Sequence, residues 1–187
     1  MKKFFYLIAA IMVASSMSIS AAERGKFVHV DNTTNKKLKP QLAFCQEHKD
    51  GADVTTLLVQ TVNASEYNQF TDASRVLIRF SGGKAIRLNR VAGSKVDQRK
   101  NSEKKGNATI SFYWTTTTYE VTPEVIEALE NGEGVVKVRI VFKENDAKDY
   151  DIEEGYQQKL GADLLKSYQE AELNNRKANS DLSDEDF

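Results

Sequence analysis

The sequence predicts a single α+β domain: an antiparallel β-sheet or partial sandwich with a short capped helix and a C-terminal amphipathic helix. Apolar and polar residues alternate with a period of two in several segments, most clearly over residues 75–91 and 135–143. Residues 122–132 carry helix start and stop signals, and residues 156–174 show helical spacing of apolar side chains. The domain is expected to span residues 23–174.

The first 22 residues have the three parts of a secretory signal peptide. A basic MKK start is followed by an apolar run over residues 4–14 (FFYLIAAIMVA) and then by small and polar residues. The SAA at 20–22 favours a cut before Glu23, and the SIS at 18–20 offers a second cut two residues earlier. The apolar run is too short to span a membrane, which takes roughly 20 residues, and no later run is apolar enough. We therefore expect an exported protein, periplasmic or extracellular, with no membrane span after cleavage.

Net charge limits the classes of partner that the chain is expected to bind. Removing residues 1–22 takes two of the 26 basic residues and none of the 27 acidic ones, so the net charge becomes −3. A nearly neutral chain has no general attraction for nucleic acid or anionic lipid, so neither is expected as a partner. The single cysteine, Cys45, allows no internal disulfide, and its apolar neighbours indicate a buried thiol.

The N-terminal part of the domain is expected to be mainly strand. Residues 27–30, 41–47 and 54–62 read as strands, although 54–62 also fits a helical period and that alternative stays open. Residues 31–39 are polar and turn-rich and separate the first two strands, and residues 63–73 are expected to form a loop after the third.

A hairpin over residues 75–91 is the clearest element. A two-residue loop at the glycine pair would mix apolar and polar residues on one face, which a half-buried hairpin does not tolerate. A three-residue loop of residues 82–84 instead pairs Phe80 with Ile86 and keeps the apolar residues together.

The next stretch, residues 92–108 (AGSKVDQRKNSEKKGNA), has a net charge of +3 and almost no apolar content, so it is expected to be a mobile basic loop. A long strand is expected next, over residues 109–121, with Trp114 on one face and Tyr113 and Tyr119 on the other.

The rest of the domain is expected to be helix, strand and helix. Thr122-Pro123-Glu124 begins a helix that Asn131-Gly132 ends. After the strand at 135–143, residues 145–154 form an acidic, irregular segment. Residues 156–174 form the amphipathic helix, within which Gly161 is expected to permit close packing. Residues 175–187 are expected to be a disordered acidic tail.

Two runs carry a family resemblance. RVLIRFSGGKAIRLNR, with YEVTPEVIEALENGEGVVKVRIVF downstream of it, resembles a pattern in small, uncharacterised exported proteins of Gram-negative anaerobic (Bacteroides-type) bacteria. The similarity covers residues 75–143. It implies a compact antiparallel α+β fold and an envelope location, and it transfers no site residue.

The sequence holds no catalytic or metal-binding signature. His29 and His48 lie in no known local motif, and GxSxG is absent. Two histidines and one cysteine without paired spacing do not suggest zinc, and the carboxylates of residues 145–154 lack EF-hand spacing. No catalytic residue, metal or cofactor is therefore predicted.

Two surfaces remain as candidate binding sites, one cationic and one aromatic. The first comprises Arg79, Arg87, Lys137 and Arg139, which point outward from strands that are expected to be neighbours, and the second comprises Tyr113 and Tyr119. The predicted hairpin places Arg79 opposite Arg87, so an acidic group is expected nearby. The alternatives are an ordinary sheet face paired with the acidic segment 145–154, and tyrosines that are covered.

These observations favour an exported, non-enzymatic binding or interaction protein of the cell envelope, with a glycan or an envelope protein as candidate partner. A small exported hydrolase with an Asp/Glu-based site, and a structural or assembly subunit, stay as alternatives. A cleft lined by a histidine and two carboxylates would favour the hydrolase, whereas an open sheet face with exposed arginines or aromatics would favour binding. The oligomeric state is left open.

Overall fold

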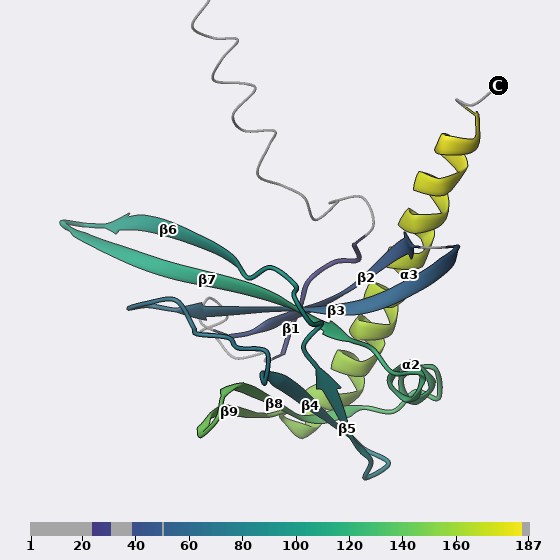
Figure 1. Ribbon diagram of the computed structural model, residues 1–187. Coiled ribbons are helices and arrows are strands. Elements are labelled where there is room, and N and C mark those ends of the chain that lie inside the picture. The colour runs from purple at the N-terminus through teal and green to yellow at the C-terminus, as the bar shows by residue number, and fades with distance from the viewer. Residues whose placement is uncertain (1–23, 31–38, 50, 185–187) are drawn as a thin grey trace, which may run out of the picture.

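The part of the chain that the structure describes folds as two antiparallel sheets with two helices, which confirms the predicted α+β class (Figure 1). The structure, a computed structural model, describes residues 24–30, 39–49 and 51–184. The predicted signal peptide, residues 1–22, lies outside the described residues.

The larger sheet has five strands in the order β1-β2-β3-β7-β6. Their bounds are β1 Val28–His29, β2 Gln41–Lys49, β3 Ala52–Asn63, β6 Asp97–Lys105 and β7 Ala108–Glu120. The prediction of strands near 27–30, 41–47 and 54–62 is therefore confirmed, and the helical alternative for residues 54–62 is wrong.

The smaller sheet has four strands in the order β5-β4-β8-β9. Their bounds are β4 Arg75–Phe80, β5 Ala85–Asn89, β8 Val135–Lys143 and β9 Asp146–Asp151. Among the described residues, two helices complete the fold, α2 Pro123–Glu130 and α3 Glu154–Asp184.

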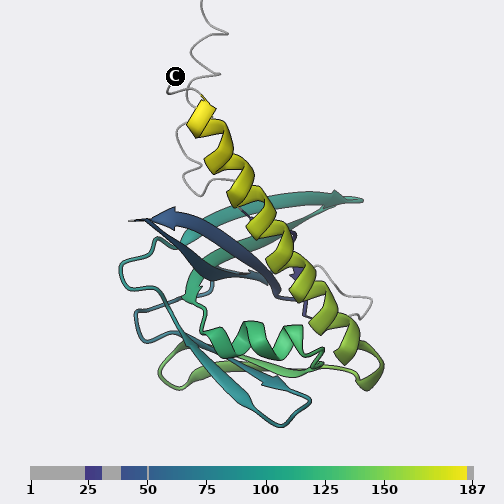
Figure 2. The ribbon, with the colours of Figure 1, turned by 90° about the vertical axis from the view of Figure 1, so that its right-hand side faces the viewer.

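One hydrophobic cluster contains residues of both sheets and both helices. In Figure 2, α2 lies between the two sheets and α3 runs along one side of the molecule. Period-two alternation directs one face of each sheet into this cluster. Its largest fully buried side chains are Tyr119, Phe44, Phe80, Phe142, Leu42, Leu57, Ile78, Leu88, Leu129, Ile140 and Leu160.

Helix α3 packs against β2 through an apolar stripe and through Ser167. The Ser167 hydroxyl accepts a hydrogen bond from the Phe44 N–H (3.1 Å) and donates one to the Lys26 carbonyl (2.8 Å). Gly161 lies where α3 meets the connection between α2 and β8, and a Cβ there would be 2.4 Å from the Glu133 carbonyl oxygen. This confirms that Gly161 permits close packing.

The β4–β5 hairpin has a three-residue loop, but the loop is shifted by one residue from the prediction. The Phe80 N–H bonds to the Lys84 carbonyl (2.9 Å) and Gly83 adopts φ +86°, so the loop is Ser81-Gly82-Gly83. A glycine in the left-handed region at this position is the usual solution for such loops. The apolar face is kept, yet Arg79 pairs with Ala85 and not with Arg87.

Strand β6 replaces most of the predicted mobile loop 92–108. Its nine residues pair in register with β7, from Asp97 opposite Thr116 to Lys105 opposite Ala108. The segment needs no apolar face, because β6 is an edge strand that backbone hydrogen bonds hold to the longer strand β7. Charged side chains along such an edge also oppose pairing with other chains.

Two acidic segments are also more ordered than predicted. Residues 146–151, expected to be irregular, form β9, which pairs with β8. Helix α3 continues to Asp184, so residues 175–184 are helical and the predicted disordered tail is wrong over that range. Extending a helix from a docked segment adds a hydrogen bond per residue without a new nucleation cost. Residues 185–187 lie outside the described residues.

Candidate functional site

The outward face of the four-stranded sheet gathers the predicted basic residues. Antiparallel register places Arg87, Leu77, Arg139 and Asp149 in one row across the strands. The neighbouring row contains Arg79, Lys137 and Asp151. We call this surface the cationic face; it comprises Arg75, Leu77, Arg79, Arg87, Lys137, Arg139, Asp149 and Asp151.

The β8–β9 side of the cationic face is largely neutralised. The Lys137 Nζ lies 3.2 Å from an Asp149 oxygen and 3.1 Å from an Asp151 oxygen. Arg139 makes a bidentate pair with Asp149, through Nε to Oδ1 and through a terminal nitrogen to Oδ2. The hydrogen bonds from Arg139, aided by Lys137, hold the pKa of Asp149 well below its usual range. Asp149 therefore stays ionised and keeps its two partners occupied, but the acidic group that was expected near Arg79 and Arg87 pairs with Arg139 and Lys137 instead.

The β4–β5 side of the same face carries positive charge without such partners. Among the residues that the structure describes, no carboxylate forms an ion pair with Arg75, Arg79 or Arg87. The Arg87 Nε donates to the Asn89 side-chain oxygen at 3.1 Å. Arg79 and Arg87 are exposed, and Leu77 between them is half-buried. Five basic and two acidic residues leave the face with a net charge of +3.

The cationic face is open to solvent. Sheet packing and both helices lie on the opposite side of the four-stranded sheet, where its inward residues Val76, Ile78 and Ile140 are buried (Figure 2). Arg79, Arg87 and Arg139 are exposed on the outward side and accessible to a large partner, whereas Val141, beside Arg75 at one end of the face, is buried.

The structure brings the four predicted basic residues together but separates them from the tyrosines. Arg79, Arg87, Lys137 and Arg139 all lie on the cationic face, whereas both tyrosines belong to β7 in the other sheet. Arg75 and Leu77 were missed as members of this face, although they share the period-two spacing of Arg79 and signal the same side of the strand.

Tyr119 is not a surface residue, and its prediction as a binding residue is wrong. Its side chain is 0% exposed and lies in the main cluster opposite Leu57. Burial raises the pKa of Tyr119 to about 12. Tyr113 is half-buried, with its ring edge-on to Tyr67 at 5.1 Å and the Lys100 Nζ 5.3 Å from its centroid. The two tyrosines therefore form no common aromatic surface.

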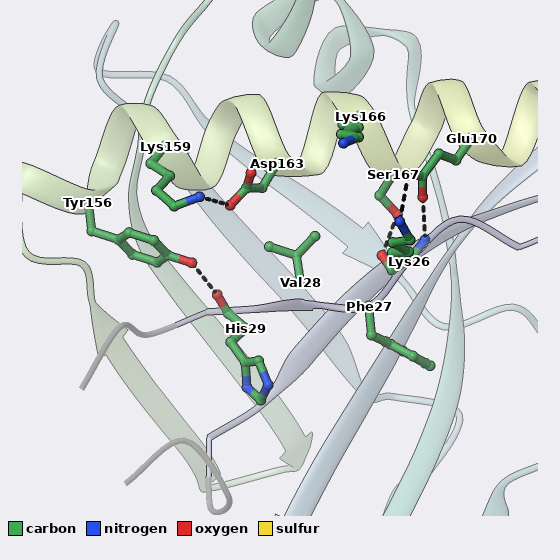
Figure 3. A pocket seen from close by; sticks show the side chains of 10 residues that line it. All are labelled: Lys26, Phe27, Val28, His29, Tyr156, Lys159, Asp163, Lys166, Ser167 and Glu170. Carbon is green, nitrogen blue, oxygen red and sulfur yellow. Dashed lines mark hydrogen bonds and ion pairs between the residues drawn. The ribbon is translucent and has the colours of Figure 1, made fainter. Parts of the chain in front are cut away.

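A cleft of about 340 Å³ between β1 and α3 contains a histidine and two carboxylates (Figure 3). The carboxylates are already engaged: Asp163 pairs with Lys159 at 2.8 Å, and Glu170 accepts the Lys26 N–H at 3.0 Å. The His29 ring points away from α3, on the far side of the β1 backbone (Figure 3). The cleft therefore contains the residue types that would favour a hydrolase, a histidine and two carboxylates. Their arrangement, however, does not place an acid and a base around one point.

A second histidine pair ties α3 to the β2–β3 hairpin. The His48 Nδ1 is 2.9 Å from an Asp53 oxygen, to which the buried Asn175 also donates at 3.0 Å. The bond with His48, and then that with Asn175, lowers the pKa of Asp53. This arrangement anchors the helix to the β2–β3 hairpin.

Metal and membrane sites are not evident in the described part of the chain. Within it, no three His, Cys, Asp or Glu residues come close enough together to hold a metal ion. Neither described helix combines the length and apolarity needed to cross a membrane. Comparisons with protein-family models, with curated proteins and with solved structures gave no match.

Proposed function

We propose that this protein is an exported, non-enzymatic binding protein of the cell envelope, and that it holds an anionic partner on its cationic face. One observation carries the proposal: Arg75, Arg79 and Arg87 share an open sheet face on which the available carboxylates are committed to Arg139 and Lys137. Guanidinium groups form planar, bidentate hydrogen bonds with carboxylates, sulfates and phosphates. The half-buried Leu77 among them adds an apolar contact at the centre.

Binding is expected to depend on the unpaired arginines. Arg79→Glu combined with Arg87→Glu should weaken retention on immobilised polygalacturonate or poly-glutamate by about tenfold or more, which corresponds to about 1.4 kcal/mol. Asp149→Asn should strengthen retention, because it releases Arg139 and Lys137 from their shared partner. Retention should also fall with added salt, since exposed charges are screened.

The matched control reverses two lysines on another surface. Lys166→Glu combined with Lys177→Glu on α3 makes the same change in net charge away from the cationic face. If this control weakened retention as much as the arginine variant, net charge and not the face would govern binding, and the proposal would be abandoned.

Export is the second component of the proposal. It is supported by the basic start, apolar run and small-residue exit of residues 1–22, and the resemblance to exported proteins points the same way. The protein recovered from cells that express the full chain should begin at Glu23, or at Ala21 if the earlier cut is used. Mass spectrometry of the intact protein from envelope and cytosolic fractions tests this, and cytosolic material that retains residues 1–22 would contradict it.

A further inference from the structure

Helix α3 extends well past the part of the fold that holds it. Buried residues recur along the part of α3 that packs on the rest of the fold, and the last of them is Asn175. They include Tyr156, Leu160, Leu164, Ala171 and Asn175. Beyond Asn175, residues Arg176, Lys177 and Ser180 are exposed. In Figures 1 and 2 the last turns of α3 project away from both sheets. At 1.5 Å per residue, Asp184 stands about 13 Å beyond the last buried position.

The sequence at the last described turn of α3 and just beyond it is strongly acidic. Residues 181–186 read DLSDED, which is four carboxylates and one leucine in six residues. The cationic face has the complementary pattern, because its arginines surround Leu77 and it carries a net charge of +3. The cleft between β1 and α3 is a poorer match, since Lys159 there is already paired with Asp163.

The described end of α3 lies far from the cationic face of its own chain. The two views in Figures 1 and 2 both place the C-terminal end of α3 and the four-stranded sheet at opposite ends of the molecule. Asn175 is held by Asp53 at 3.0 Å, so the helix axis is fixed where it leaves the body. A contact between the two surfaces therefore requires two molecules.

We propose that residues 181–186 of one copy dock on the cationic face of a second copy, so that the protein self-associates head to tail. The proposal rests on the proposed function, because it assigns the anionic partner of the same face. The contact joins two different patches, so each added copy presents a free face and a free helix end, and the product is a chain or a closed ring. Charge supplies the complementarity, so association should weaken with salt.

Sedimentation velocity of the purified full-chain protein tests the proposal. Wild type should show concentration-dependent association at low ionic strength that is lost in 1 M NaCl. A face-reversed variant (Arg79→Glu, Arg87→Glu) and an end-reversed variant (Asp184→Lys, Glu185→Lys) should each associate about tenfold more weakly or not at all. A control with the same charge change away from both surfaces (Lys104→Glu, Lys166→Glu) should associate like wild type.

Mixing the two reversed variants provides a readout that misfolding cannot imitate. The acidic face of one variant meets the basic end of the other, and the remaining basic face meets the remaining acidic end, so association should return as an alternating assembly. A wild type that stays monomeric, or reversed variants that associate as wild type does, would overturn the proposal. So would a mixture that stays monomeric.

Retention on polygalacturonate separates this proposal from the proposed function. The end-reversed variant keeps an intact cationic face and should still be retained, whereas the face-reversed variant should not. A monomeric wild type that is retained would overturn self-association and leave anion binding in place. A wild type that is not retained at low salt would contradict the proposed function itself.

Discussion

Replacing Tyr119 with alanine is expected to lower the free energy of unfolding by about 4 kcal/mol, the range for truncating a fully buried aromatic side chain. Tyr119 is 0% exposed and is the largest of the fully buried side chains. Its ring fills space between the two sheets, opposite Leu57. Since a domain of this size is stable by about 5–15 kcal/mol, the loss is a large part of the total.

Tyr113 is the matched control, because it lies on the same strand and the same face. Its contacts are the edge of Tyr67 and the Lys100 ammonium group, and its side chain is only half-buried. Tyr113→Ala should therefore cost about 1 kcal/mol, the range for one aromatic pair. Urea denaturation monitored by circular dichroism measures both variants. Equal effects, or a Tyr119→Ala protein as stable as wild type, would show that β7 does not face the core as described.

The contrast between these tyrosines shows what alternation in a sequence can and cannot predict. A period of two tells which residues share a face of a strand, and it correctly placed Tyr113 with Tyr119 and apart from Trp114. It does not tell what packs on that face. The inner end of β7 is covered by the core, whereas residues 108–112 extend past the end of β3 and pair with β6 alone.

The candidate site shows the same contrast between what strand alternation predicts and what depends on tertiary structure. The outward positions of Arg79, Arg87, Lys137 and Arg139 result from strand alternation, so these four positions were predictable, although Arg75 and Leu77 on the same face were missed. The pairing of β9 with β8 depends on tertiary structure, and it decides that Arg139 is neutralised by Asp149 whereas Arg79 is not.

Polar secondary structure was the main source of error. Side-chain periodicity indicates an element only where there is an apolar stripe, and neither β6 nor the end of α3 has one. Both are continued by backbone hydrogen bonds from a better-packed neighbour, which leaves no mark in side-chain hydrophobicity. Both also project from the body, so the regions that the sequence pattern predicts least well are those most available to a partner.

Gly161→Ala is expected to lower the free energy of unfolding by about 2 kcal/mol, in the range for overpacking a close contact. In an exposed helix the same change would raise stability by up to about 1 kcal/mol, because alanine has the higher helix propensity. Here the new Cβ would lie 2.4 Å from the Glu133 carbonyl oxygen, which is backbone and cannot rotate aside. Gly134 faces the same contact from the other side, with its own Cβ position 3.0 Å from Gln157.

Gly155→Ala is the matched control in the same helix, since no atom lies within 4 Å of its Cβ position. It should be neutral or stabilising by up to about 1 kcal/mol, so the two substitutions are expected to have opposite signs in urea denaturation. The Gly161→Ala variant should also disturb the β4–β5 loop, because Gly134 exchanges hydrogen bonds with Ser81 at 2.8 and 3.1 Å. Two glycines with the same effect would mean that α3 does not pack against the α2–β8 connection, and the direction in which its acidic end projects would have to be reassigned.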